Sequence, residues 1–148
     1  MSNVEVVRRL LGALDGGDFE TARTLLAPDF STTPVSTGIP IGLEEWFDVH
    51  KALHENFPTL RRNPSDFRAE GDNVIVTLHV TARNDRPVRL PQLGIEELPA
   101  TGIEIVSPPN VDTFTLRDGK VTSVQSEMAP GGGFKGMIEQ IRAAAAAR

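Results

Sequence analysis

The chain has no cysteine among its 148 residues. This excludes disulfide bonds, cysteine metal sites and cysteine nucleophiles, and it fits a reducing compartment. No apolar run approaches the roughly 20 residues needed to cross a bilayer. The N-terminal stretch MSNVEVVRRLLGALDGGD also lacks the charged and then apolar order of a signal peptide. These absences predict a soluble, cytoplasmic protein without a membrane partner.

Clusters of positive charge are absent as well. The formal net charge is −5, with Lys and Arg scattered along the chain, so nucleic acid is not an expected partner. No Gly-rich phosphate loop, Ser-x-x-Lys pattern or Ser/His/Asp order supports phosphoryl or nucleophilic chemistry. Length and 39% hydrophobic content fit one domain, residues 1–148, with a single core. The alanine run at 143–147 predicts that a last helix frays over 143–148.

Helical spacing of apolar residues dominates the first part of the chain. Ser2 and Glu5 form a capping box for a helix over about 3–14, and Asp18 caps a short second helix. Residues 29–40 predict a short irregular strand and a loop. A third helix is predicted from Gly42 to Phe57, before Pro58. Its inward stripe holds four apolar residues and two histidines: Leu43, Trp46, Phe47, His50, His54 and Phe57.

Alternation with a period of two follows. VIVTLHVTA at 74–82 predicts a strand with one buried face, with His79 on the other face, where a dimer contact is expected. VDTFTLRDGKVTSVQSEM at 111–128 predicts two more strands, and a last helix begins near Phe134. Residues 83–103 carry three prolines and two glycines and predict a lid or mobile loop. Helices, then an antiparallel sheet, then a helix indicate an α+β fold.

The hairpin at 111–128 allows two registers. A two-residue turn at Asp118-Gly119 pairs Arg117 with Lys120. The face of Asp112 then contains Ser123, Gln125 and Glu127. A type I turn at Arg117-Asp118 with Gly119 as a bulge pairs Leu116 with Lys120 instead. The face of Asp112 then contains Phe114, Leu116, Thr122, Val124, Ser126 and Met128. We favour the bulged turn because it buries more apolar groups.

Asp112 lies in phase with apolar residues, which leaves two interpretations open. Burial among them would raise the pKa of the carboxyl, as proton transfer near neutral pH requires. Alternatively, Asp112 is a structural residue that accepts backbone hydrogen bonds at a strand start. His50 and His54, at i and i+4, could share a metal, but no third ligand is evident, so no metal is expected and a hydrogen-bonding role in the core or pocket is favoured.

Four stretches carry a family resemblance: GLEEWFDVHKALHENFPTL, FRAEGDNVIVTLHVTA, LPATG and VDTFTLRDGKV. In this order they resemble the SnoaL-like branch of the nuclear transport factor 2-like superfamily. The resemblance implies a cone-shaped barrel, in which a curved, mostly antiparallel sheet wraps around the long helix and encloses an apolar pocket, and it implies a homodimer. Such proteins include polyketide cyclases, ketosteroid isomerases and epoxide hydrolases, all without metal or organic cofactor.

Carried over residue by residue, Asp112 matches the common pocket acid of the family. The aldol acid/base of the cyclases falls on Ser126, and a frequent tryptophan falls on Gln125, so the chain departs from the family at both positions. Serine cannot take a proton from carbon without a base beside it. Glu127 could supply one if a local bulge turned it inward.

We therefore expect a cofactor-free cyclase or isomerase for a polyketide-like hydrophobic carbonyl or polyene substrate. A non-catalytic binding or dimerisation module is the alternative, and an epoxide hydrolase or ketosteroid-isomerase-like enzyme is a further one. The expected catalytic residues are Asp112, Ser126, His50 and Glu127. The expected substrate-binding residues are Leu14, Trp46, Phe47, His54, Phe114, Val124, Gln125 and Met128. The expected apolar lid residues are Leu90, Leu93, Ile95 and Leu98.

Overall fold

A computed structural model describes residues 1–34 and 37–147. Positions 35–36 of the predicted loop and position 148 of the predicted frayed tail lie outside the described residues. The helices of the described part are α1 (Asn3–Asp15), α2 (Phe19–Thr24), α3 (Leu43–Asn56), the short 3-10 helix η1 (Pro91–Leu93) and α4 (Gly133–Ala146). The strands are β1 (Ser31–Thr32), β2 (Ile41–Gly42), β3 (Ser65–Glu70), β4 (Asn73–Leu78), β5 (Thr81–Arg83), β6 (Glu104–Val106), β7 (Asn110–Arg117) and β8 (Lys120–Met128).

The helix starts follow the predicted caps. The Ser2 hydroxyl accepts a hydrogen bond from the Glu5 backbone N–H, and the Asp18 carboxylate accepts one from Thr21, each at 3.2 Å. The long helix α3 also has the predicted extent. The alanine run continues α4 as far as Ala146, in line with its helix propensity, so the fraying predicted from residue 143 is not seen over 143–146.

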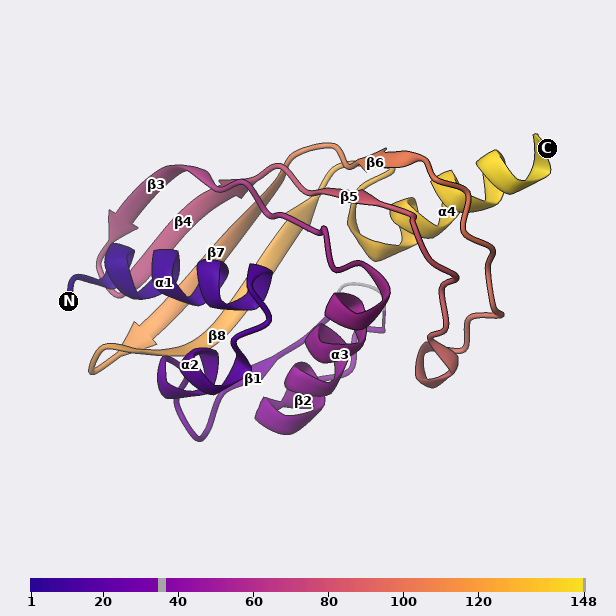
Figure 1. Ribbon diagram of the computed structural model, residues 1–148. Helices are drawn as coiled ribbons and strands as arrows, with labels where there is room; N and C mark the ends of the chain where they lie inside the picture. The colour runs from indigo at the N-terminus through magenta and orange to yellow at the C-terminus, as the bar shows by residue number, and fades with distance from the viewer. Residues whose placement is uncertain (35–36, 148) are drawn as a thin grey trace.

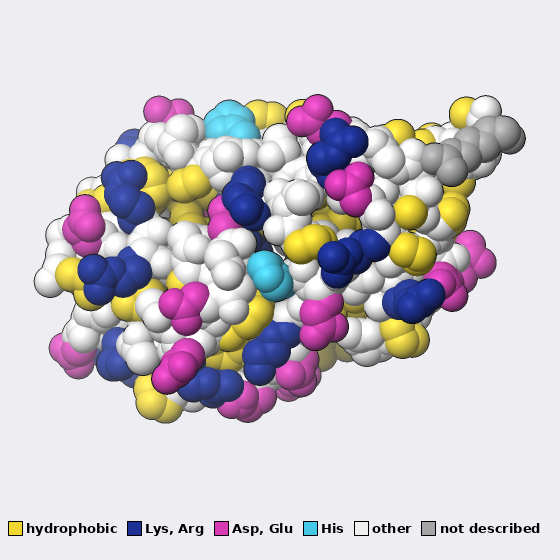
Figure 2. Space-filling model, viewed as in Figure 1, with side chains coloured by type: hydrophobic (Ala, Val, Ile, Leu, Met, Phe, Trp, Pro, Cys, Tyr) yellow, Lys and Arg dark blue, Asp and Glu magenta, His cyan; other side chains and the backbone are white. Residues whose placement is uncertain are grey.

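An antiparallel four-stranded sheet in the order β3-β4-β7-β8 forms the centre of the molecule, with α1 packed across it and α3 beside α1 (Figure 1). Two separate two-stranded sheets, β1-β2 and β5-β6, flank it. The α+β class is confirmed. No helix of the described residues combines the length and the apolar character needed to cross a membrane. Acidic and basic side chains are interspersed on the face shown in Figure 2.

The strand predicted at 74–82 is interrupted after Leu78. There the His79 backbone N–H donates to the Arg62 carbonyl at 2.9 Å, and Thr81 pairs with Arg61. After Leu78 the chain therefore no longer pairs with the central sheet and pairs instead with the segment that follows α3. It then continues as β5, which pairs with β6.

The β7–β8 hairpin corrects our choice of turn. Arg117 pairs with Lys120 around a two-residue turn in which Asp118 and Gly119 have φ of 52° and 76°. The favoured bulged turn is therefore wrong. A bulge further along, between the pairs Leu116–Val121 and Thr115–Ser123, shifts the register by one residue. Asp112 consequently lies opposite Ser126, on the face that the favoured register predicted for both.

Within the part of the chain that the structure describes, two hydrophobic clusters replace the single core expected from composition. The first lies between the central sheet and helices α1 to α3, and the second joins the end of α3, β5, β6 and α4. The predicted lid belongs to the second cluster, because Leu90 and Leu98 are buried there with Phe57. Leu93 is exposed. Most residues of 83–103 are exposed, but Val88, Leu90 and Leu98 anchor the segment in the second cluster, so a lid role over the site is not supported for Leu90 and Leu98.

Candidate active site

Asp112 is the central residue of the site. It lies on β7 between Val76 of β4 and Ser126 of β8, and only 8% of it is exposed. The Asn110 side-chain amide donates to Asp112 Oδ1 at 2.8 Å. Burial raises the pKa of Asp112, while hydrogen bonds from Ser126 and Asn110 and the charge of Arg62 act in the opposite direction. The structure therefore shows a buried carboxyl held by side chains, with a raised pKa.

His50 is the second polar group of the interior. Its imidazole packs against the Trp46 ring, with 4.1 Å between ring centroids, and its Nδ1 lies 3.1 Å from Arg62 Nη2. Burial, and secondly the positive charge of Arg62, lower the pKa of His50 to about 3. The imidazole is therefore neutral at physiological pH. Arg62 acts electrostatically on both His50 and Asp112, which places the three groups in one region.

A buried ion pair connects the site to α1. Arg62 Nη1 lies 2.5 Å from Asp15 Oδ1, and the Arg62 backbone N–H donates to Asp15 Oδ2 at 3.2 Å. Our sequence reasoning missed Arg62, Asp15 and Asn110. One signal was available: Asp15 is the last residue of α1, where the helix dipole disfavours a carboxylate unless a cation is close.

A small cavity adjoins His50. It has a volume of about 10 Å³, which is room for about one water molecule. Its lining residues are Leu14, His50, Leu53, His54, Phe57, Leu60 and Arg62. His54 also packs edge-on against the Phe19 ring, with centroids 5.9 Å apart. Of the residues expected around a substrate pocket, Leu14, His50 and His54 thus share a cavity.

Four other expected pocket residues are brought together, but they fill the space between them. Trp46, Phe47, Phe114 and Val124 are all buried in the first cluster. The Trp46 and Phe47 rings meet edge-on with centroids 5.6 Å apart. A substrate larger than a few atoms must therefore displace side chains or secondary structure to reach Asp112.

Three expected site residues lie elsewhere. Glu127 pairs with Val111 and Gln125 with Thr113, so both belong to the face opposite Asp112, and both are exposed. The bulge in β8 lies nearer the turn and does not turn Glu127 inward. Met128 is exposed as well, at the end of β8. A catalytic role for Glu127 and pocket roles for Gln125 and Met128 are therefore not supported.

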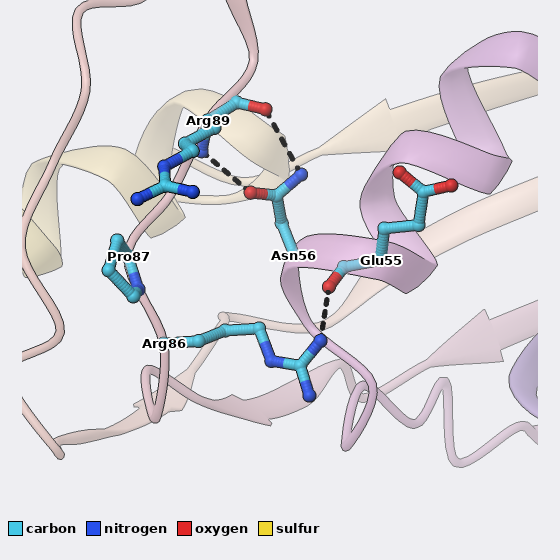
Figure 3. A pocket seen from close by; sticks show the side chains of 5 residues that line it. All are labelled: Glu55, Asn56, Arg86, Pro87 and Arg89. Carbon is cyan, nitrogen blue, oxygen red and sulfur yellow. Dashed lines mark hydrogen bonds between the residues drawn. The ribbon is translucent and has the colours of Figure 1, made fainter.

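A larger, polar cavity of about 270 Å³ lies outside this site, at the end of α3 (Figure 3). It is lined by Glu55, Asn56, Arg86, Pro87 and Arg89. The Asn56 side chain accepts from the Arg89 backbone N–H at 2.6 Å and donates to the Arg89 carbonyl at 3.3 Å, which holds the loop against the helix. None of the residues expected at the active site lines this cavity.

Metal ligands do not converge around the histidines. Within residues 1–34 and 37–147, no three His, Cys, Asp or Glu side chains gather to hold a metal. His50 Nδ1 is instead engaged by Arg62.

The SnoaL-like domain family matches residues 7–124. Among solved structures, a protein provisionally described as a SnoaL-like polyketide cyclase from Jannaschia sp. CCS1 is 30% identical, with 86% of this chain and 85% of that chain covered and a TM-score of 0.70. IdmH from Streptomyces antibioticus, provisionally a polyketide cyclase, is 21% identical over 96% of this chain and 99% of its own, with a TM-score of 0.76. AclR from Streptomyces galilaeus, provisionally a hydroxylase, is 15% identical over 95% and 96%, with a TM-score of 0.74.

No curated protein matches the chain. The low identities of IdmH and AclR establish likeness of fold alone. The family match is stronger evidence, because it spans most of the sequence and includes Asp15, His50, Arg62 and Asp112, although it ends before Ser126. The chain therefore belongs to the SnoaL-like domain family.

Proposed function

We propose that this protein is a cofactor-independent cyclase or isomerase that acts on a hydrophobic carbonyl compound of the polyketide type. The observation that carries the proposal is Asp112, a buried carboxyl with a raised pKa and two side-chain hydrogen-bond partners. The polyketide class is supported by the description of the Jannaschia protein, which shares the family and the fold.

Asp112 would move the proton in such a reaction. As a carboxylate it takes a proton from the carbon beside a substrate carbonyl, and the resulting enolate carbon attacks a second carbonyl carbon to form the new carbon–carbon bond. The proton then passes from Asp112 to the alkoxide oxygen of the product. A raised pKa favours the first step, because it brings the affinity of the base for a proton closer to that of the carbon acid.

Ser126 would orient the carboxyl rather than act as a base. Its hydroxyl hydrogen-bonds Asp112, and so does the Asn110 amide, on the neighbouring position of the same face. Two donors on one carboxylate restrict its rotation. Replacement of Ser126 by Ala should therefore reduce activity less than replacement of Asp112.

Proton abstraction can be measured without knowing the natural substrate. In D₂O, exchange of the α-hydrogens of 1-tetralone would be followed by NMR with the wild type and with Asp112→Asn. We expect exchange to fall by about 10²–10⁴-fold in the variant, the usual contribution of a general base. Glu127→Gln is the matched control, since Glu127 is a nearby carboxylate on the opposite face. Equal exchange by wild type and Asp112→Asn would remove Asp112 from the mechanism.

The departures from the family pattern at Gln125 and Ser126 favour a second candidate, a non-catalytic small-molecule-binding or dimerisation module of the same fold. In that case 1-tetralone would bind without faster exchange of its α-hydrogens. We also propose a homodimer through the outer face of the sheet, next to the break after Leu78 where His79 is exposed. Analytical ultracentrifugation of wild type and His79→Glu tests this, because a new charge in such an interface should shift the protein toward monomer.

A further inference from the structure

The contact between Arg62 and His50 determines which ring nitrogen of the histidine carries hydrogen. A guanidinium group only donates hydrogen bonds, so His50 Nδ1, 3.1 Å from Arg62 Nη2, must present its lone pair. In a neutral imidazole the hydrogen then resides on Nε2. A protonated imidazole would set two donors against each other. The lowered pKa of His50 agrees with the neutral form.

The position of the guanidinium is itself fixed. Arg62 is 8% exposed, and its Nη1 is paired with Asp15 at 2.5 Å. Asp15 also accepts the Arg62 backbone N–H, so side chain and main chain are tied to the same carboxylate. The charge of Asp15 keeps Arg62 paired in the interior, and Arg62 in turn orients the imidazole.

The Nε2 side of His50 is open. In the described part of the chain, His50 has no hydrogen bond other than that with Arg62. Every fully buried side-chain nitrogen or oxygen described has a partner, so an unpartnered Nε2 has to be accessible. His50 lines the cavity of about 10 Å³, and Arg62 lines it too. The imidazole of His50 and the side chain of Arg62 therefore border the same small space.

We infer that the Asp15–Arg62 pair fixes His50 as the Nε2–H tautomer and makes this cavity a subsite for one substrate oxygen that accepts a hydrogen bond, such as a ketone or enolate oxygen. The cavity holds about one oxygen-sized group, and two of its three polar lining residues, Arg62 and the Nε2–H form of His50, are donors, with His54 as the third. An ammonium group would be disfavoured there. Developing negative charge on the oxygen would be stabilised by the same two donors. In this arrangement Arg62 is a positioning residue.

The tautomer of His50 does not depend on catalysis. The oxygen subsite, in contrast, rests on the proposed function, because that function supplies the carbonyl substrate. Long-range ¹H–¹⁵N NMR of the unliganded protein reads the tautomer directly. The chain has three histidines, so His54→Gln and His79→Gln assign the signals. We expect His50 at neutral pH to show a protonated Nε2 and an unprotonated Nδ1. Arg62→Met should mix the tautomers, while the neighbouring and exposed Arg61→Met should not.

An Nδ1-protonated or doubly protonated His50 in the wild type overturns the inference, and this result does not depend on whether a variant folds. The subsite is tested with 1-tetralone and tetralin, which differ by one carbonyl oxygen. The ketone should shift the His50 Nε2 signal and the hydrocarbon should not. Equal shifts with both, or no shift with saturating ketone, overturn the subsite. This test detects contact of the ketone with His50 and does not depend on α-hydrogen exchange. Failure of the subsite can therefore be told apart from failure of the proposed function.

Discussion

Removing one partner of the buried Asp15–Arg62 pair should destabilise the protein far more than removing a partner of an equally short pair at the surface. The side chains of Arg62 and Asp15 are 10% and 17% exposed, so either charge left alone would be poorly solvated. Loss of one partner of such a pair typically costs about 3–5 kcal/mol. Because some solvent still reaches Asp15, we expect about 3 kcal/mol for Asp15→Asn.

The double variant Asp15→Asn with Arg62→Met gives the sharper test. It removes both charges, so no unpaired charge remains in the interior. Its destabilisation should fall short of the sum of the two single changes by about 2 kcal/mol, within the range expected for contacting residues. The matched control is Glu44→Gln, because Arg23 and Glu44 are also 2.5 Å apart but are 46% and 69% exposed. We expect no measurable change for that variant.

Urea unfolding followed by tryptophan fluorescence suits this measurement. The chain has one tryptophan, Trp46, and it packs on His50 beside Arg62. Equal slopes against urea would show that the variants change stability rather than the extent of unfolding. The reasoning would be refuted if Asp15→Asn matched Glu44→Gln, or if the two single changes in the buried pair were simply additive.

Three further predictions concern stability. Because burial raises the folded-state pKa of Asp112, the folded state holds its proton longer than the unfolded chain, and stability falls as pH rises above about 4 toward the folded pKa. In urea titrations at several pH values, the stability of Asp112→Asn relative to wild type should therefore increase as the pH rises above about 4. A difference in stability that does not change with pH would contradict the raised pKa. In thermal melts, Gly136→Ala should destabilise the protein by at least about 2 kcal/mol, because the new Cβ would lie 1.9 Å from the Gly131 carbonyl oxygen. Gly12→Ala should instead stabilise it by up to about 1 kcal/mol, because Gly12 has open space around it on the exposed face of α1. By the same measurement, Leu90→Ala should lower the stability by about 2–5 kcal/mol, because Leu90 is fully buried. Leu93→Ala, at an exposed position, should lower it by less than about 0.5 kcal/mol. The reverse order would indicate that Leu90 is a lid residue rather than a core residue.

Local patterns predicted the features that depend on neighbours in the chain. Asp112 could be assigned to the inner face because it alternates with Phe114 and Leu116 on one strand. The hairpin turn was mistaken because the bulge in β8 restores the same face after a different turn. A hydrophobic pattern specifies which side a residue faces, but several combinations of turn and bulge give the same side.

The contacts that define the site were not predictable in this way. Asp15 and Arg62 are 47 residues apart and meet only because α1 and the segment after α3 lie together. Neither belongs to a periodic pattern. The segment 83–103 could not be placed for a related reason: Val88, Leu90 and Leu98 are buried among mostly exposed neighbours, and Val88 meets Leu98 only through an isolated bridge across the loop. Burial there follows from tertiary packing rather than from local periodicity.

The division of the interior into two clusters has a consequence for the cooperativity of the fold. Val80 packs against both clusters, at the point where β4 gives way to β5. A junction of this kind separates units that can open independently, and backbone amide hydrogens then exchange fastest in the less stable unit. The cavity beside His50 lies across it, since Leu14 belongs to the first cluster and Phe57 and Leu60 to the second. Opening of the second cluster would thus widen the cavity beside His50 while the sheet that carries Asp112 stays folded.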